Sequence, residues 1–376
     1  MQGGVTMTSI TYVGMDVHTT NYTVCCYDAE HDRYFGMAKL EPDYQEVVKH
    51  LNRVNTQNGG NCRFICGYEA GCLGYSLYHE MVGQGFDCII LAPSSMPVVP
   101  GKKVKTDRRD SQNIARCLAH RNYSPVYVPT DQDDAIKEYI RMRDDMAQAL
   151  KRIKQQTLAL CTRHGKHFSE TRTKWTKAHL DWLEKLDLGN AILNETLREY
   201  LTMYYILAEK VETYDARIEE LASLDANKEK VKRLVCLKGI ATHTALSMCV
   251  EVGDFQRFPD AGHFAAYLGL VPGQDASGDK SKRMPITKAG NRHLRRLLIE
   301  AAQCYSRGYV PKKSKALKAR QQGNSPQVIA YADRANDRLK RKYIRIALRS
   351  SSAIAKTAVA RELACYVWGL MTDHIQ

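Results

Sequence analysis

The residues of this chain best suited to chemistry are four carboxylates at the ends of expected strands and helices: Asp16, Glu69, Asp107 and Asp110. Asp16 interrupts an apolar strand pattern, and Glu69 ends another. Asp107 and Asp110 lie three residues apart at the start of an expected helix, so both can point at one spot. Hard divalent cations prefer oxygen ligands of this kind, and two such ions roughly 4 Å apart can activate an attacking oxygen and stabilise a leaving one. The pattern predicts phosphodiester chemistry that depends on Mg²⁺ or Mn²⁺.

A purely structural explanation of the same acids stays open on these residues alone. An aspartate near a strand end commonly caps a turn, and the run from Asp107 to Asp110 also fits a solvated helix start. Asp16 differs because it falls inside its strand pattern, where an unpaired buried carboxylate is costly. A metal ion or a strong hydrogen-bond network is therefore expected beside Asp16.

Strand and helix patterns alternate over residues 1–127, the segment that must position these acids. The expected strands cover residues 11–17, 22–27, 33–40, 63–68 and 87–91, and the expected helices cover residues 43–54, 75–82 and 108–119. This order predicts an α/β domain with a mixed sheet. It fits an RNase H-like fold, in which the first strand brings an acid to the centre of the sheet.

The middle of the chain, residues 128–227, has a helical pattern with an apolar seam in 4-3-4-3 spacing, which predicts two long helices. The later seam comprises Leu193, Leu197, Tyr200, Tyr204, Leu207, Val211, Tyr214, Ile218 and Leu221. The earlier seam comprises Ile136, Tyr139, Met146, Leu150, Ile153 and Leu160, with Arg143 and Thr157 at seam positions. An intramolecular bundle and a dimerising coiled coil are equally compatible with this pattern.

The charge of the chain is concentrated at its C-terminal end. Residues 275–376 hold 22 Lys and Arg against 7 Asp and Glu, a balance of +15, whereas the remainder holds 33 against 34. The basic segment also carries apolar residues at helical spacing, so it should fold. A folded surface of this charge predicts binding to a polyanion such as nucleic acid.

The composition indicates an ordinary soluble protein. The 376 residues suffice for two or three domains, and 44% are hydrophobic. No stretch approaches the roughly 20 apolar residues of a membrane span, and the N-terminus lacks the features of a signal peptide, so we expect a cytoplasmic protein without membrane partners. The twelve cysteines include no Cys-x-x-Cys pair and are expected to be buried free thiols.

Residues 228–376 contain two features suited to nucleic acid. Two short helical patterns surround a turn at Lys238 and Gly239, which resembles a helix-hairpin-helix whose backbone amides bind phosphate. A loop rich in Gly, Asp and Ser then carries Ser277 and leads into a basic helix over residues 292–303. The residues expected to contact nucleic acid are Lys238, Gly239, Lys280, Lys282, Arg283, Lys288, Asn291, Arg292, Arg295 and Arg296. Lys312, Lys313, Lys315, Lys318 and residues 338–342 are interpreted as further backbone contacts, with a solvated helix face as the alternative.

Several motifs occur in a fixed order along the chain. They are Asp16 in a first strand and the segments at residues 68–71, 105–110, 237–240, 268–272, 277–278 and 286–291. The motifs Lys-Thr-Asp-Arg-x-Asp and Gly-Leu-Val-Pro…Ser-Gly…Ile-Thr-Lys-x-Gly-Asn are the specific ones. In this order they resemble the DEDD insertion-sequence transposases of the IS110 class, described as bridge-RNA-guided recombinases. The helical middle and the last ~70 residues contribute no motif to the resemblance.

The resemblance implies three domains: a RuvC-like metal-binding domain at residues 1–127, a coiled-coil domain at 128–227 and a mainly helical transposase domain at 228–376. The four acids would be the metal tetrad, and Ser277 would be the nucleophile that forms a phosphoserine link to DNA. Ala276 stands where the family often has a further serine, and Ser281 is a weaker candidate. The resemblance also implies a structured guide RNA encoded by the element, donor and target DNA, and a homodimer or homotetramer on the bacterial or archaeal nucleoid.

Three functions remain open at this point. The first is a DNA recombinase that uses Mg²⁺ and Ser277. The second is a RuvC-like endonuclease in which the acids activate water and Ser277 takes no part. The third is a nucleic-acid-binding protein whose acids are structural. A covalent protein–DNA adduct separates the first function from the other two.

Overall fold

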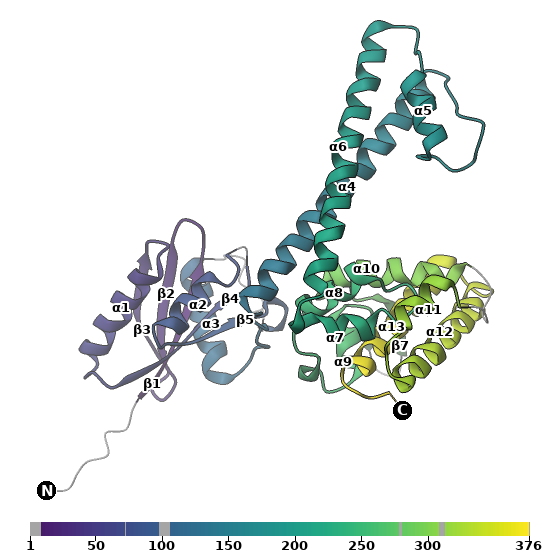
Figure 1. The fold of residues 1–376 in the computed structure, drawn as a ribbon. Helices are drawn as coiled ribbons and strands as arrows, with labels where there is room; N and C mark the ends of the chain where they lie inside the picture. Colours follow the sequence, from purple (N-terminus) through teal and green to yellow (C-terminus); the bar gives the residue numbers. More distant parts are fainter. Residues whose placement is uncertain (1–8, 72, 98–105, 278–279, 308–312, 376) are drawn as a thin grey trace, which may run out of the picture. The chain divides into compact units, whose positions relative to one another are not determined.

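The computed structural model describes the chain except residues 1–8, 72, 98–105, 278–279, 308–312 and 376 (Figure 1). The chain forms two compact units, Met1–Val128 and Pro129–Gln376. Each unit has its own elements and its own hydrophobic core, and each is described by itself below.

The first unit is built on a five-stranded mixed sheet. Its strands are β1 Ser9–Val17, β2 Tyr22–Asp28, β3 Arg33–Leu40, β4 Cys62–Glu69 and β5 Asp87–Leu91, in the order β3-β2-β1-β4-β5. The pairs β1–β2 and β2–β3 are antiparallel, whereas β1–β4 and β4–β5 are parallel. The central strand is therefore the one that carries Asp16.

Three helices flank this sheet: α1 Tyr44–Gln57, α2 Ser76–Gly83 and α3 Asp107–His120. Successive residues of a strand point to opposite faces. Val13 and Met15 of β1 are buried with Leu51 of α1 and Met81 of α2, so these two helices cover one face. Gly14 meets α3 on the other face. The expected strands and helices of this unit are confirmed, with ends that differ by a few residues, and so is the mixed α/β sheet.

The second unit begins with a long antiparallel helical hairpin, formed by α4 Asp131–Arg163 and α6 Ala191–Ala222, with the short helix α5 Lys177–Lys185 near its tip (Figure 1). The rings of Tyr139 and Tyr214, both seam residues, meet edge to face with centroids 5.8 Å apart. Arg143 binds Asp215 through Nε at 2.6 Å and Nη2 at 2.8 Å. The two predicted seams thus face one another within the chain.

The body of the second unit is helical, and its helices are α7 Asp225–Leu234, α8 Thr242–Val252, α9 Ala261–Tyr267, α10 Arg292–Ala302, α11 Lys315–Gln321, α12 Pro326–Ala347 and α13 Ser352–Met371. Short 3-10 helices occur at Phe255–Arg257 and Gln303–Ser306 in this unit and at Pro93–Ser95 in the first. Helix α13 packs against α7, α9, α10 and α12. Its residues Val359, Leu363 and Val367 are fully buried, so the last helix completes the core.

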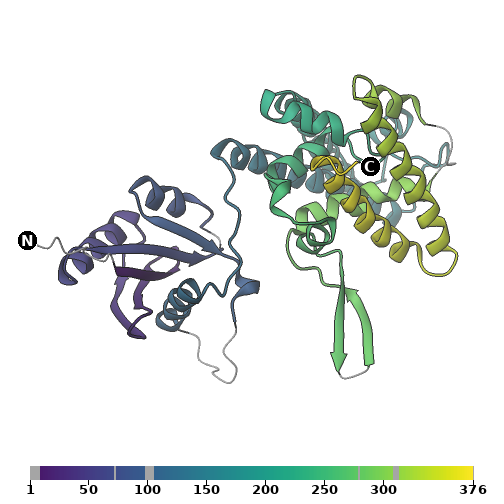
Figure 2. The same ribbon diagram turned by 90° about the horizontal axis from the view of Figure 1, so that it is seen from below.

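A two-stranded antiparallel ribbon, β6 Pro272–Ser277 and β7 Lys280–Ile286, extends from this helical body (Figure 2). The expectation of a loop around Ser277 was wrong, because Ser277 ends a strand. Apart from Ile286 at the end of β7, the two strands lack the β-branched residues that mark most strands, and each depends on the other strand for its pairing. A ribbon of two strands is marginally stable alone, so its attachment to the body matters.

Two further expectations concern the chain as a whole. Within the described residues, no helix combines the length and apolar character needed to cross a membrane. All cysteines in the described part of the chain are free thiols, and most of them are buried. The expectation of free thiols is therefore confirmed for these residues.

Candidate metal centre

Two glycines in register allow α3 to lie directly on the sheet. Gly14 of β1 pairs with Gly67 of β4. A Cβ atom at Gly14 would lie 2.0 Å from the Ser111 carbonyl oxygen and 2.4 Å from the Ala115 amide nitrogen. At Gly67 it would lie 2.9 Å from Leu118 Cδ2. Any side chain at Gly14 would therefore push α3 away from the central strand.

This close packing brings the first turn of α3 to the acid on β1. Asp16 follows Gly14 by two residues and so shares its face of the sheet. Asp107 precedes Ser111 by four residues and so shares the helix face that packs on the sheet. Ligand atoms of Asp16, Asp107 and His18 all lie within 4.8 Å of one another. The end of β1, with His18 just after it, and the first turn of α3 thus converge on one group of metal-ligand atoms.

The electrostatics of this group favour a bound cation. Burial raises the pKa of the Asp16 carboxyl above its ordinary value, and the charges of Asp110 and Asp107 raise it further, while His18 lowers it. His18 Nε2 lies 3.2 Å from Asp16 Oδ2. The charges of Asp107 and Asp110 therefore act against ionisation of Asp16, which the half-exposed His18 contacts. A donor set dominated by carboxylates suits a hard divalent ion.

The four predicted acids differ in how close they lie to the ligand group at Asp16. Asp110 lies close enough for its charge to act on Asp16. Glu69 ends β4 one step beyond the pair Met15–Tyr68, level with Asp16 in the parallel register. Within the described residues, however, the three-ligand group consists of Asp16, His18 and Asp107, without Glu69. The role of Glu69 as a ligand stays a prediction.

Sequence reasoning missed His18 as a possible ligand. The signal was present, because His18 follows Asp16 by two residues along a strand and can lie on the same side. The residue was overlooked because it comes just after the apolar pattern ends, where an exposed histidine is common.

The ribbon that carries Ser277 is clamped at its base. A Cβ atom at Gly269 would lie 2.1 Å from the Ala289 carbonyl oxygen, and one at Gly290 would lie 2.0 Å from that of Tyr267. Both glycines have positive φ, at 64° and 69°. Arg295 donates from Nη1 to the carbonyl oxygens of Leu268 and Ala289, at 2.9 Å each. These contacts fix the two ends of the ribbon to each other and to α10.

The strand register defines the surroundings of the predicted nucleophile. Ser277 pairs with Lys280, and Ala276 pairs with Ser281. Lys282 and Arg283, two further predicted phosphate ligands, follow on the same strand β7. The side chains of residues 274–283 lie outside the described part of the structure, as do residues 278–279. Ser277 belongs to the second unit, whereas the four acids belong to the first.

Several residues predicted to contact nucleic acid are engaged inside the protein. The amide of Lys238 donates to Asn336 Oδ1 at 2.9 Å, and a Cβ atom at Gly239 would lie 2.4 Å from the carbonyl oxygen of Ala301. Internal contacts also engage Asn291 with Glu251, Arg295 with the Leu268 carbonyl oxygen, and Arg296 with Asp144. Arg292 and Lys288 are exposed and remain available. The phosphate-binding role of the Lys238–Gly239 turn is untested, and its lysine amide is already paired.

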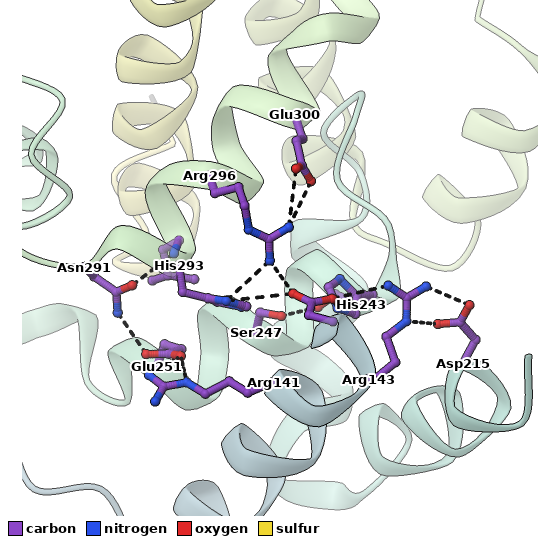
Figure 3. Close-up of polar contacts among 12 residues, drawn as sticks. Arg141, Arg143, Asp215, His243, Ser247, Glu251, Asn291, His293, Arg296 and Glu300 are labelled. Carbon is purple, nitrogen blue, oxygen red and sulfur yellow. Dashed lines mark hydrogen bonds and ion pairs between the residues drawn. The ribbon is translucent and has the colours of Figure 1, made fainter. Parts of the chain in front are cut away.

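A polar network that the sequence did not predict surrounds Asp144 of α4, and Figure 3 labels its partners Arg143, His243, His293 and Arg296. His243 Nε2 of α8 lies 2.9 Å from Asp144 Oδ1, Arg143 Nη1 lies 3.3 Å away, and Arg296 Nη2 of α10 contacts Oδ2. His293 Nδ1 lies 3.8 Å from Oδ2. The close contacts with His243 and Arg296, and the charges of both, outweigh the burial of Asp144 and hold its pKa below the usual range.

A second carboxylate joins the hairpin to the start of α10. Glu251 of α8 accepts from Arg141 Nη2 at 2.9 Å and from Asn291 Nδ2 at 2.8 Å (Figure 3). Asn291 Oδ1 in turn caps α10 by accepting from the Leu294 amide at 2.9 Å. The foot of the hairpin is therefore bonded to the helix that follows the ribbon.

Comparison with known proteins gives a consistent result over both units. A family model described as Transposase, of the DEDD IS110 type, matches residues 13–165, and one described as Transposase IS116/IS110/IS902 family matches residues 231–317. A putative transposase, y4qE of Sinorhizobium fredii, is 36% identical over 97% of this chain and 89% of its own length. The transposase for insertion sequence element IS1533 of Leptospira borgpetersenii is 28% identical over 88% of this chain and 95% of its own length.

Proposed function

Because this chain belongs to the IS110/IS116 family of insertion-sequence transposases, we propose that it cuts DNA by attack of the Ser277 hydroxyl on a phosphodiester, with divalent metal ions bound at the acids of the first unit. As a DNA transposase, it cuts and rejoins strands when an insertion sequence moves. The serine, the metal and the guide RNA are the proposed parts of this function.

The convergence of Asp16 and Asp107 is the observation that carries the proposal. These two carboxylates would hold the ion, and Glu69 and Asp110 would complete the tetrad. Mg²⁺ or Mn²⁺ bound there would lower the pKa of an attacking oxygen and neutralise charge on the phosphate. The raised pKa of Asp16 supports this role, because a bound cation would offset both the cost of burying the charged carboxyl and the repulsion from the neighbouring acids.

In the proposed cleavage step, Ser277 Oγ forms a bond to phosphorus as the bond from phosphorus to one deoxyribose oxygen breaks. The serine proton is lost, and the leaving oxygen gains a proton to become a hydroxyl. One phosphate ester replaces another, so the link conserves bond energy and the reverse step can rejoin strands without a nucleotide cofactor. The cations Lys280, Lys282 and Arg283 on the same ribbon suit a phosphate ligand.

The fold and the partners belong to the same proposal. The strand order β3-β2-β1-β4-β5, with Asp16 on the central strand, supports an RNase H-like, RuvC-like domain at residues 1–127. The proposed division continues with a coiled-coil domain at 128–227 and a transposase domain at 228–376. The balance of +15 over residues 275–376 supports binding of donor and target DNA and of a structured guide RNA. A homodimer or homotetramer completes the proposal.

Denaturing electrophoresis of labelled DNA tests the serine directly. Wild-type protein with Mg²⁺ should give a covalent adduct, and Ser277→Ala should bind DNA without forming one. Ser281→Ala is the matched control, because Ser281 lies on the facing strand of the same ribbon, and it should still form the adduct. An adduct that persists in Ser277→Ala and disappears in Ser281→Ala would move the nucleophile.

A metal-dependent endonuclease that uses water is the second candidate. The observation that favours it is that the ligand group forms within the first unit alone. This enzyme would nick DNA in the presence of Mg²⁺ and leave no protein attached. Cleavage by Ser277→Ala at the wild-type rate, with no adduct from either protein, would select this candidate.

A further inference from the structure

Helix α12 presents a row of arginines to solvent. Arg334, Arg338, Arg341 and Arg345 follow one another at intervals of four, three and four residues, which places them on one face of the helix. The row covers about 16 Å along the axis at 1.5 Å per residue. The side chains of Arg338 and Arg341 are 72% and 77% exposed. By contrast, Lys340 is buried and donates to the carbonyl oxygens of Tyr305 and Arg307.

The arginine row borders a groove between α12 and α13, two helices that pack side by side (Figure 1). A cavity of about 760 Å³ is lined by Arg334, Asp337, Arg338, Arg341, Lys342, Arg345 and Glu362. An adjoining cavity of about 400 Å³ is lined by Tyr331, Arg338, Lys342, Arg361, Glu362, Cys365 and Tyr366. Arg338, Lys342 and Glu362 line both cavities, so the two lie side by side. We call the two cavities together the α12–α13 groove.

Glu362 holds two of the cations in place. It accepts a hydrogen bond from Arg338 Nε and another from Lys342 Nζ, each at 2.5 Å. Its side chain is only 14% exposed. Burial raises the pKa of the Glu362 carboxyl, but the hydrogen bonds from Lys342 and Arg338 outweigh that effect and leave it below its usual value. The acid therefore stays ionised and positions cations whose remaining donors face the groove.

The inner end of the α12–α13 groove has an aromatic wall. The ring of Tyr366 is partly exposed, and it meets the buried ring of Tyr331 edge to face with centroids 5.4 Å apart. Tyr331 also donates from its hydroxyl to the Tyr366 carbonyl oxygen at 3.4 Å, which ties the two helices together. A cavity of about 400 Å³ falls within the range of small-ligand sites.

We propose that the α12–α13 groove binds a single-stranded stretch of polynucleotide, with its phosphates along the arginine row and one unpaired base against Tyr366. A positive track beside an aromatic ring is the combination that single-strand-binding surfaces use. A base inside a duplex is stacked and paired, so it cannot reach a ring in a cavity between two helices. This inference rests on the proposed function, because strand cleavage and guide pairing both generate unpaired nucleic acid.

Fluorescence anisotropy with the full-length protein in Mg²⁺-free buffer tests the groove. The probes are a labelled single-stranded DNA, the RNA of the same sequence and the corresponding blunt DNA duplex. The test variant is the triple substitution Arg338→Gln, Arg341→Gln and Arg345→Gln. The control variant is Lys210→Gln, Lys228→Gln and Lys230→Gln, which removes the same charge from exposed positions on α6 and α7.

The arginine variant should bind single strands at least about tenfold more weakly and should flatten the slope of log K against log salt by about 2, at roughly 0.7 per lost phosphate contact. The control variant should leave both quantities near the wild-type values. Tyr366→Leu should weaken single-strand binding by at least about fivefold without changing the salt slope, because it removes stacking rather than charge. Its effect on the duplex should be small.

Three outcomes would overturn the inference. The first is an equal loss of single-strand affinity in the arginine and control variants, and the second is an equal loss of affinity for duplex and single strand in Tyr366→Leu. The third is that polyglutamate, added as a competitor, displaces the labelled single strand completely and does so equally well from wild type and from Tyr366→Leu. Weaker binding of both the DNA and the RNA single strand supports a site for either nucleic acid, whereas weaker binding of the RNA alone supports the guide RNA as its ligand. If the groove variants bind single strands with normal affinity while the wild-type protein forms the serine adduct, the groove proposal is rejected and the proposed function is kept. Circular dichroism of each variant establishes that it is folded.

Discussion

Asp16 in the first unit and Asp144 in the second are both largely buried, with 14% and 6% of their side chains exposed, yet their surroundings are opposite. Asp144 is met by Arg143, Arg296 and His243 from three helices. Asp16 is met by two further acids and one half-exposed histidine. Burial acts to raise the pKa of both carboxyls, but the cations around Asp144 reverse the shift, whereas the acids around Asp16 increase it.

This contrast distinguishes the structural carboxylate Asp144 from the proposed metal ligand Asp16. The charge of Asp144 is balanced by groups of the protein itself, so it can hold three helices together in the folded state. At Asp16 the charges of Asp107 and Asp110 disfavour the ionised carboxyl, and a cation bound beside it would offset that effect. The same residue type is thus expected to serve stability in one unit and, under the proposed function, metal binding in the other, so substitutions at the two sites should have different consequences.

The largest expected effect is the loss of strand cleavage in Asp16→Asn. The amide removes a charged ligand, so metal-dependent cleavage of DNA should fall below detection. Folding should be unaffected or slightly improved, because the substitution also removes repulsion with Asp107 and Asp110. Cleavage assays and thermal unfolding in metal-free buffer measure the two properties. Near-normal cleavage by this variant would remove Asp16 from the active site.

The next effect is on stability and comes from Asp144→Asn. This substitution leaves Arg143 and Arg296 without their shared carboxylate in a part-buried site, which should lower the free energy of unfolding by about 3–5 kcal/mol. The neighbouring exposed residue Asp145 provides the control, because Asp145→Asn should change the free energy of unfolding by no more than about 0.5 kcal/mol. Denaturant unfolding measures both. Equal stability of the two variants would contradict the structural role of Asp144.

A smaller effect should follow from Gly14→Ala, which removes no ligand. Its methyl group would meet the backbone of α3 at Ser111 and Ala115, and overpacking of this kind costs about 1–3 kcal/mol. Movement of α3 should also displace Asp107 from Asp16 and weaken binding of Mn²⁺, which isothermal titration calorimetry measures. Gly83→Ala, at a position with open space around it, is the control. Unchanged Mn²⁺ affinity in Gly14→Ala would show that the metal site does not depend on this contact.

The smallest effect concerns pH. The folded pKa of Asp144 is lowered, so its contribution to stability is present above the unfolded value of about 3.9 and is lost as the pH falls below it. The stability difference between wild type and Asp144→Asn should therefore shrink between pH 5 and pH 3, as judged by denaturant unfolding at each pH. Arg143, His243, His293 and Arg296 face this carboxyl from the elements packed around it. A difference that is constant over this range would contradict the lowered pKa.

Much of the fold could be predicted because its determinants are local. The alternation of apolar residues defined the strands of the first unit, and the 4-3-4-3 seam defined α4 and α6. Asp16, Asp107 and Asp110 were identifiable because each breaks or begins such a pattern. The ribbon was missed, since its strands lack apolar alternation and are stabilised by the clamp at Gly269, Gly290 and Arg295.

The sequence by itself determined the secondary structure outside the β6–β7 ribbon, the basic character of residues 275–376 and the acids available for a metal site. Only the tertiary structure decided which of these side chains meet. It paired Gly14 with Gly67 so that α3 could approach, and it surrounded Asp144 with cations far away in the sequence. The physical reason is that periodicity specifies which face of an element is apolar, whereas contacts between elements depend on how those faces pack. Buried charges and grooves such as that between α12 and α13 exist only after that packing.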